Sequence, residues 1–276
     1  MSPEGHPSDD RHCAGSRRGD APAVQVATFP MPAGFVFDWH AHIDHQLAWA
    51  ASGVLTVLTD TATWVLPPTR ALWIPAGLRH ETRSSGTAVM RSAYLSPAQC
   101  LVSWPEATPV AATRLLAELV GYLESDDLAA DQRAHAEAVL AGLLEPVTMA
   151  TIELRFPPPG PARQVAQALA ANPDDHRTLD QWGRLAGASG RSLARAFVAG
   201  TGLTFGRWRV LARLQAALPA LAGGHPISGV ARRAGYESAS AFVAAFRRET
   251  GTTPAAYFDE LPDPAGPAGP AAPPAA

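Results

Sequence analysis

Three histidines in the N-terminal half have the residue type and spacing that suit a metal site. His40 and His42 are two positions apart, and alternate side chains of a strand lie on one face. Gln46 has the same parity and joins them if the strand continues, while a Pro-x-Gly turn before His80 can return that side chain to the same place. Three imidazoles suit Zn, Ni, Co, Cu or Fe(II), whereas a set without a carboxylate binds hard metals weakly. We therefore predict a transition-metal site at His40, His42 and His80, with Gln46 as a further ligand.

Two residues beside this set have different expected roles. His45 has the opposite strand parity, so its ring is expected to point away from the other histidines. Asp44 is a candidate partner of a ligand or an alternative ligand. The competing interpretation is a domain that keeps these residues without a metal and binds a small organic effector instead.

A second group of residues recurs in the C-terminal half. Ala186-Gly187 is echoed by Ala234-Gly235, and Phe197 is echoed by Phe246, at offsets of 48 and 49 residues. Each copy reads as a helix, a glycine-containing turn and a second helix, which is the helix-turn-helix arrangement. The offset of 49 residues also pairs Gly202 with Gly251 and Trp208 with Tyr257.

The second helix of each copy carries side chains suited to DNA. Thr178 and Gln181 predict a capping box for a helix over 178–186, and serines can cap helices over 190–199 and 239–249. Arginine can bond guanine O6 and N7 together, which is a specific base contact. The candidate DNA-binding residues are Ser189, Arg191, Ser192, Arg195, Ser238, Ser240 and Arg247.

The charge is divided between the two halves of the chain. All 22 basic residues are arginine, and the formal net charge of the 276 residues is -3. Residues 1–160 hold 10 Arg and 17 Asp or Glu, a charge of -7, whereas residues 161–260 hold 12 Arg and 7 acidic residues, a charge of +5. The basic half is therefore the candidate for binding nucleic acid, and the acidic half handles something else.

The hydrophobic pattern also changes along the chain. Residues 22–104 read as short strands broken by Pro and Gly, which is typical of an all-β domain. Helical spacing predicts helices over 109–124 and 128–145, and a Pro-rich run at 157–161 indicates a boundary. The predicted strands are 24–29, 35–39, 46–50, 53–59, 63–66, 71–74 and 89–95, and a linking helix is predicted over 207–221.

The C-terminal pattern resembles the signature of the AraC/XylS family of transcription regulators over residues 165–258. The resemblance rests on Ile227-x2-Val230, Gly235-Tyr236-x-Ser238-x-Ser240-x-Phe242-x3-Phe246 and Gly251-x-Thr253-Pro254. It implies that one monomer places two recognition helices in successive major grooves, about 34 Å apart. Pro219 departs from the pattern and is expected to shorten the linking helix.

The N-terminal pattern resembles the two cupin motifs. These are Gly34-x5-His40-x-His42-x3-Gln46-x6-Gly53 and Pro75-x-Gly77-x2-His80. Gln46 stands where the motif has a metal-binding Glu, and Thr69 and Ser84 replace a usual Gly and Asn. A subgroup of these regulators has a similar His-x-His-x3-Gln-Leu run, and some of its members are associated with metal homeostasis, including repression of nickel and cobalt efflux.

The predicted fold is an α+β multidomain chain: an N-terminal cupin-like β jelly-roll barrel with flanking helices and a C-terminal all-α domain with two helix-turn-helix motifs. The predicted organisation is a tail at 1–20, a sensory domain at 21–105, a helical dimerisation or linker region at 106–156, a linker at 157–161, a DNA-binding domain at 162–260 with helix-turn-helix motifs at 178–199 and 227–249, and a tail at 261–276.

We predict a sequence-specific transcription regulator that binds double-stranded DNA and senses a divalent transition metal (Ni, Co, Zn or Fe). The alternative is the same regulator with a small organic ligand. A cupin metalloenzyme is disfavoured because no carboxylate occupies the Glu position. With two cysteines, no apolar N-terminal segment and no membrane-length apolar run, we expect a cytoplasmic protein. The two helices within 109–145 carry more apolar positions than a small edge helix needs, so we expect them to pack on the β domain or on a second copy, as a homodimer.

Overall fold

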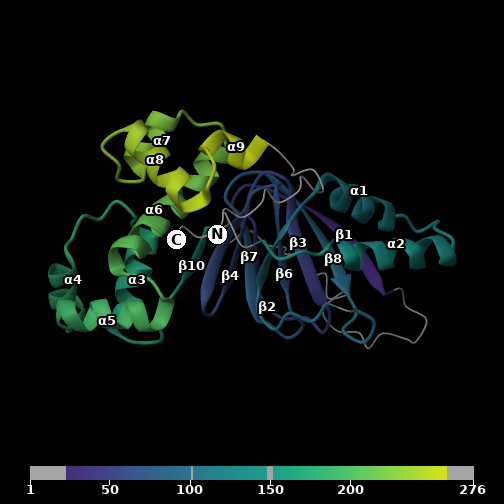
Figure 1. The fold of residues 1–276 in the computed structure, drawn as a ribbon, viewed down its shortest axis with the longest axis horizontal. Helices are drawn as coiled ribbons and strands as arrows, with labels where there is room; N and C mark the ends of the chain where they lie inside the picture. The colour runs from purple at the N-terminus through teal and green to yellow at the C-terminus, as the bar shows by residue number, and fades with distance from the viewer. Residues whose placement is uncertain (1–22, 101, 148–151, 260–276) are drawn as a thin grey trace, which may run out of the picture.

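Two five-stranded antiparallel sheets face each other in the N-terminal half of the computed structural model, and helices form the C-terminal half (Figure 1). The structure describes residues 23–100, 102–147 and 152–259, so the predicted tails lie outside it. The predicted fold class is confirmed. The strands are β1 (Val24–Met31), β2 (Val36–His40), β3 (His45–Ser52), β4 (Leu55–Thr59), β5 (Ala62–Leu66), β6 (Arg70–Ile74), β7 (His80–Ser84), β8 (Ala88–Leu95), β9 (Thr108–Ala111) and β10 (Glu153–Arg155).

The two sheets enclose an apolar core because their strands alternate. One sheet has the order β1-β8-β3-β6-β9 and the other β10-β5-β4-β7-β2. In β4, Leu55 and Val57 are fully buried while the residues between and after them are less covered, as expected for a strand with one face toward the core. Leu55 and Val57 pack with Leu72 and other residues of the opposite sheet. This sandwich is the frame that holds the histidines.

Helices α1 (Arg114–Leu123) and α2 (Ala130–Leu143) cover the outer face of the first sheet. Trp49 and Trp73 of that sheet share one buried cluster with Leu116 of α1 and Leu140 of α2. The side chain of Thr113 accepts the backbone N–H of Leu116 and so caps α1. These helices are therefore part of the core of the β half.

The remaining helices form two similar units around a long connecting helix. Their bounds are α3 (Pro161–Ala171), α4 (Leu179–Ala186), α5 (Gly190–Thr201), α6 (Phe205–Ala222), α7 (Ile227–Arg233), α8 (Ala239–Thr250) and α9 (Pro254–Asp259). Phe197 and Trp208 are buried in the cluster of the first unit. Phe246 and Tyr257, their repeat equivalents, are buried in the cluster of the second unit. The repeat in the sequence is thus a repeat of buried positions.

Several predicted elements need correction. The helix predicted from residue 109 begins at Arg114, because Thr108–Ala111 forms β9 and pairs with β6. The region 106–156 therefore contains β9 and β10 as well as helices, and β7 was also missed. Each is short, and its pairing partner is distant in the sequence. The expectation that Pro219 shortens the linking helix is wrong, since α6 continues to Ala222.

The helical half is docked against the sheet that contains β5 and β10 (Figure 1). The indole N–H of Trp208 donates to the Arg155 carbonyl at 2.6 Å. The Gln215 amide donates to the carbonyls of Thr63 at 2.8 Å and Ile152 at 3.2 Å. At the second unit, the Thr69 hydroxyl donates to the Tyr257 carbonyl at 3.0 Å. Trp208 and Tyr257, which are equivalent in the repeat, both bond to the β half.

Within the described ranges, no helix is both long and apolar enough to cross a membrane.

Candidate metal centre and nucleic-acid interface

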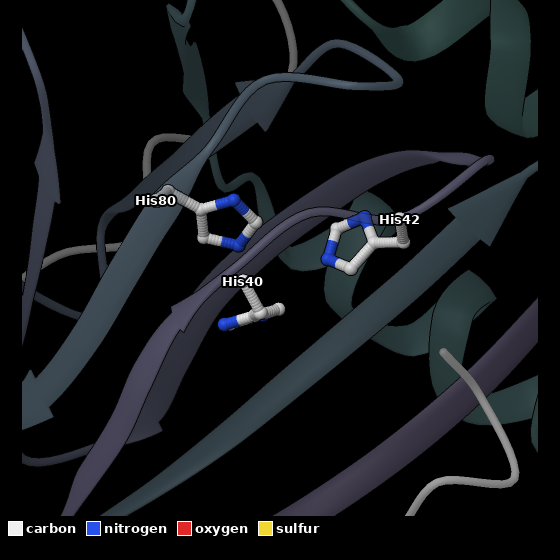
Figure 2. Close-up of side chains that lie close together, drawn as sticks. All are labelled: His40, His42 and His80. Atoms are coloured by element: carbon white, nitrogen blue, oxygen red, sulfur yellow. The ribbon is translucent and has the colours of Figure 1, made fainter. Parts of the chain in front are cut away.

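Three histidines converge at one end of the sandwich (Figure 2). His40 ends β2, His42 lies in the loop between β2 and β3, and His80 begins β7, where it is the register partner of His40. One ring nitrogen from each residue lies within 4.8 Å of the other two. The ring centroids of His40 and His80 are 4.4 Å apart, and those of His42 and His80 are 4.9 Å apart. The predicted three-histidine cluster is therefore present in the structure.

Backbone carbonyls orient all three rings. The Nδ1 atoms of His40, His42 and His80 lie 2.6, 3.3 and 2.9 Å from the carbonyl oxygens of Asp38, Asp44 and Leu78 respectively. A carbonyl oxygen can only accept, so each Nδ1 carries the proton and each Nε2 keeps its lone pair. In metal sites, a ligating histidine usually donates its other N–H to such a partner. The backbone carbonyl of Asp44 thus contacts the His42 ring, and Asp44 as an alternative ligand stays a prediction.

Burial keeps two of these imidazoles neutral. Burial is the largest cause that lowers the pKa of His42 to about 4 and the pKa of His80 to about 3. The Nε2 atoms of both rings are buried without a hydrogen-bond partner among the described residues. A buried nitrogen that lacks a partner is costly, and a neutral imidazole is the form that binds metals. The donor set therefore fits a transition metal.

Gln46 reaches this place from the opposite sheet. Its Nε2 donates to the Ser92 hydroxyl at 2.8 Å, while its Oε1 is buried without a partner in the described part of the chain. The Gln46 side chain lies close enough to His42 to raise the pKa of that ring, against the larger effect of burial. The premise that one strand carries both His40 and His42 is wrong, because β2 ends at His40. The condition set for Gln46, a strand that continues to it, is not met either, because β3 begins at His45 in the other sheet. Gln46 nevertheless has a free acceptor available for a metal.

Two further side chains lie near this site, and only one of them contacts a histidine of the cluster. Tyr94, which the sequence reasoning missed, is the register partner of Gln46, and its ring centroid lies 5.3 Å from that of His42. Only the pairing of β3 with β8 brings it there. His45 is outside the cluster, as its parity predicted. Its Nδ1 accepts the N–H of Ala76 at 3.0 Å, and its ring stacks on Trp73.

Both helix-turn-helix units have the predicted caps. The Thr178 hydroxyl accepts the N–H of Gln181, whose side chain returns to the Thr178 N–H. Gly187 has a φ of 68°, a left-handed conformation that favours glycine, at the turn between α4 and α5. The hydroxyls of Ser189 and Ser238 accept the N–H groups of Ser192 and Ala241, so they cap α5 and α8.

The remaining candidate DNA contacts lie on exposed surfaces of α5 and α8. Arg191, Arg195 and Arg247 are exposed and have no hydrogen bond or ion pair among the residues that the structure describes. Arg207 and Arg248 instead both bond to Glu249, at 3.2 and 3.1 Å, whereas Arg184, Arg232 and Arg233 are also exposed and without a side-chain partner among the described residues. Ser192 and Ser240 are exposed on the same two helices. Free guanidinium groups can reach bases or phosphates.

Comparison with known proteins identifies the family. Residues 22–144 match the AraC-like ligand binding domain, and residues 182–260 match a helix-turn-helix domain. The HTH-type transcriptional regulator NimR of Escherichia coli is 30% identical over 237 residues, covering 80% of this chain and 82% of NimR. The chain belongs to the AraC family of transcription regulators. The resemblance found in the sequence is confirmed, and membership of the metal-homeostasis subgroup stays a prediction.

Other proteins match this AraC-family regulator over part of its sequence or in structure at low sequence identity. The HTH-type transcriptional regulator RipA of Corynebacterium glutamicum is 41% identical over 102 residues, which is 37% of this chain and 31% of RipA. The crystal structure of ToxT from Vibrio cholerae matches with a TM-score of 0.38 and 11% identity, covering 87% of this chain and 98% of ToxT. The two family matches show that the regulator combines a ligand-binding domain with a DNA-binding domain, and NimR and RipA are transcription regulators.

The two groups of arginines give a test of the nucleic-acid interface. Arg191→Ala is expected to weaken binding to a selected DNA site by about 1–3 kcal/mol and to relax the preference at one base pair. Arg232→Ala, at the exposed end of α7, should weaken all DNA sequences alike. Fluorescence anisotropy on DNA selected in vitro with the full chain measures both, at one salt concentration because phosphate contacts depend on salt. Equal effects of the two variants on specificity would contradict this assignment.

Proposed function

We propose that this regulator senses a divalent transition metal, which His40, His42 and His80 hold through their Nε2 atoms, with the Gln46 Oε1 as a further ligand. The observation that carries the proposal is the convergence of three rings whose Nδ1 atoms all bond to carbonyls. Three neutral imidazoles and an amide oxygen suit Ni, Co, Zn or Fe(II). A bound metal would supply directional bonds that hold the three rings together.

The sheet that holds two of the ligands also holds the DNA-binding half. His80 begins β7, which pairs with β4, and β4 pairs in turn with β5 and β5 with β10. The Gln215 side chain of α6 bonds to backbone carbonyls in β5 and next to β10. A change at the histidines therefore acts on the same sheet that positions α6. Metal binding changes DNA binding only if the two conformations bind the metal unequally.

We also propose that two copies pair through α1 and α2, as the sequence predicted. Leu115 and Tyr122 of α1 are each 44% exposed, and Val139 of α2 is 49% exposed. Apolar side chains that stay exposed on adjacent helices support a contact with a second copy. Such pairing would present four recognition helices to DNA. Because pairing follows mass action, the fraction of paired regulator would rise with protein concentration.

Metal reconstitution tests the proposed effector. The purified full chain is first stripped of metal with a chelator. After it is reconstituted with Ni, Co, Zn or Fe(II) and freed of excess metal, we expect it to retain one ion per chain. Its affinity for selected DNA, read by footprinting with and without each metal, should change by about 5–150-fold, the usual range for coupled sites. No retained metal, together with a full DNA response to an organic molecule alone, would overturn the metal proposal and favour an organic effector.

A further inference from the structure

Helix α6 belongs to the cores of both helix-turn-helix units (Figure 1). Ala212 is buried in the cluster of the first unit, and Leu214, two residues later, is buried in the cluster of the second unit. The residue between them is Arg213, which is half-buried. Long helices commonly bend, so α6 alone does not fix how one unit is oriented relative to the other. That orientation depends on the contacts made where one core ends and the next begins.

The Arg213 guanidinium joins a segment of the first unit to the turn of the second. Its Nε donates to the Pro173 carbonyl at 2.9 Å, and one terminal nitrogen donates to the Gly235 carbonyl at 3.3 Å. The other terminal nitrogen lies 3.3 Å from Nδ1 of His176, which accepts because arginine only donates. Pro173 and His176 lie between α3 and α4, whereas Gly235 lies between α7 and α8. One side chain therefore bonds to both units.

The backbones of the two units also come close beside this side chain. Gly235 has a φ of 75°, a left-handed conformation that favours glycine. A Cβ atom at this position would lie 3.2 Å from the Cα of Asp174 and 3.1 Å from the guanidinium carbon of Arg213. Both distances are shorter than ordinary van der Waals contact. The turn of the second unit thus packs directly on the segment that Arg213 contacts in the first.

The charged and polar groups around Arg213 come from both units as well. Burial and then the nearby Arg209 lower the pKa of Arg213, whereas Tyr236 of the second unit and Asp174 of the first raise it. A planar guanidinium can bond to several acceptors in fixed directions, which the single ammonium of lysine cannot do. The arrangement at this point of α6 therefore depends on arginine in particular.

We propose that Arg213 is a positioning residue that fixes the distance and angle between the recognition helices α5 and α8. It thereby sets the spacing of the two DNA half-sites that one chain binds together. Successive major grooves on one face of DNA are about 34 Å or 10 base pairs apart, so one added base pair rotates a half-site by about a tenth of a turn. The proposal rests on DNA binding by both recognition helices and does not depend on the proposed metal.

DNA duplexes with altered spacers test this role. Sites are selected in vitro with the full chain, and hydroxyl-radical footprinting locates the two half-sites of one chain. One base pair is then inserted or removed between them, and fluorescence anisotropy measures the affinity at one salt concentration. We expect each change to weaken binding by the wild type at least about tenfold, because one helix loses its base contacts or the DNA must deform. Arg213→Gln should bind the altered duplexes only about threefold more weakly than its original site, because its two units can rotate to follow the spacer.

Arg209→Gln is the matched control. Arg209 lies about one turn earlier on α6 and donates to the Arg177 carbonyl at 3.2 Å, in the same segment of the first unit. Its ring contact is with Phe205, also of the first unit's core, and it bonds to no described residue of the second unit. This variant should keep the wild-type loss of affinity at altered spacers, whatever its affinity for the original site.

Circular dichroism during thermal unfolding shows whether each variant is folded. Arg213→Lys takes the place of Arg213→Gln if the latter does not fold, with the same expected result, because lysine lacks the planar fork. A folded Arg213 variant that keeps the wild-type loss at altered spacers would overturn the proposal, as would an equal decrease of that loss in Arg209→Gln. A wild-type chain that binds all three spacings alike, or a footprint with a single half-site, would also overturn it.

Discussion

Replacing His80 with alanine is expected to abolish metal retention by the full chain. His80 is completely buried, and its ring faces those of both His40 and His42. Loss of a partner that merely orients a ligand typically costs about 10–100-fold in metal affinity, so loss of a ligand should cost more. The metal content after reconstitution at pH 7, followed by competition with a chelator, measures the effect. At this pH the rings of His42 and His80 are neutral in the metal-free protein, because burial lowers their pKa values to about 4 and about 3.

The control is another histidine changed in the same way. His135 is exposed on α2 and outside the cluster, so His135→Ala should retain metal as the wild type does. Thermal unfolding of the metal-free His80→Ala protein shows whether the sandwich still folds. A folded His80→Ala protein that retains one metal per chain with wild-type affinity would show that the three histidines are not the site.

Trp208→Ala is expected to lower the free energy of unfolding by about 3–5 kcal/mol, the usual cost of removing a large aromatic side chain from a core. Trp208 is completely buried, and its ring packs against Phe197 and Phe156 at centroid distances of 5.4 and 6.0 Å. Its N–H also bonds to the Arg155 carbonyl in β10, so the loss affects both the helical core and its docking. Urea denaturation followed by circular dichroism measures the change.

Trp208→Phe separates packing from the hydrogen bond. Phenylalanine keeps most of the apolar contact but leaves the Arg155 carbonyl without its donor, which should cost about 1–3 kcal/mol. The same variant should weaken the link between metal and DNA affinity, because that bond joins the sheet of the site to α6. If Trp208→Phe and Trp208→Ala were equally stable, the packing described for this residue would be incorrect.

Local patterns made much of the helical half predictable. The capping box at Thr178 and the caps at Ser189 and Ser238 depend on residues three apart, so each is readable from a few letters. Buried aromatic residues at the same offset, such as Phe197 and Phe246, marked the repeat. Strands with clear alternation were also found. The short strands β9 and β10 were missed because each forms only by pairing with a distant strand.

The candidate site was predicted in part, for the same reason. His40, His42 and His80 were identified from their types and their motif spacing. The condition stated for Gln46, a strand continuing from His40, is not met, because Gln46 reaches the site from the other sheet through β3. Tyr94 follows from the register of β3 with β8. No local signal carries that register.

The sequence by itself thus determined the family, the two-part architecture, the helix-turn-helix repeat and the three histidines. All of these are set by residue types at short or repeated spacing. Only the tertiary structure decided that the acceptor atom of Gln46 is left free, that Trp208 and Gln215 join α6 to the sheet of the histidines, and that Arg213 bonds to both helix-turn-helix units. These features depend on contacts between segments distant in the chain, whose geometry is set by how whole sheets and helices pack.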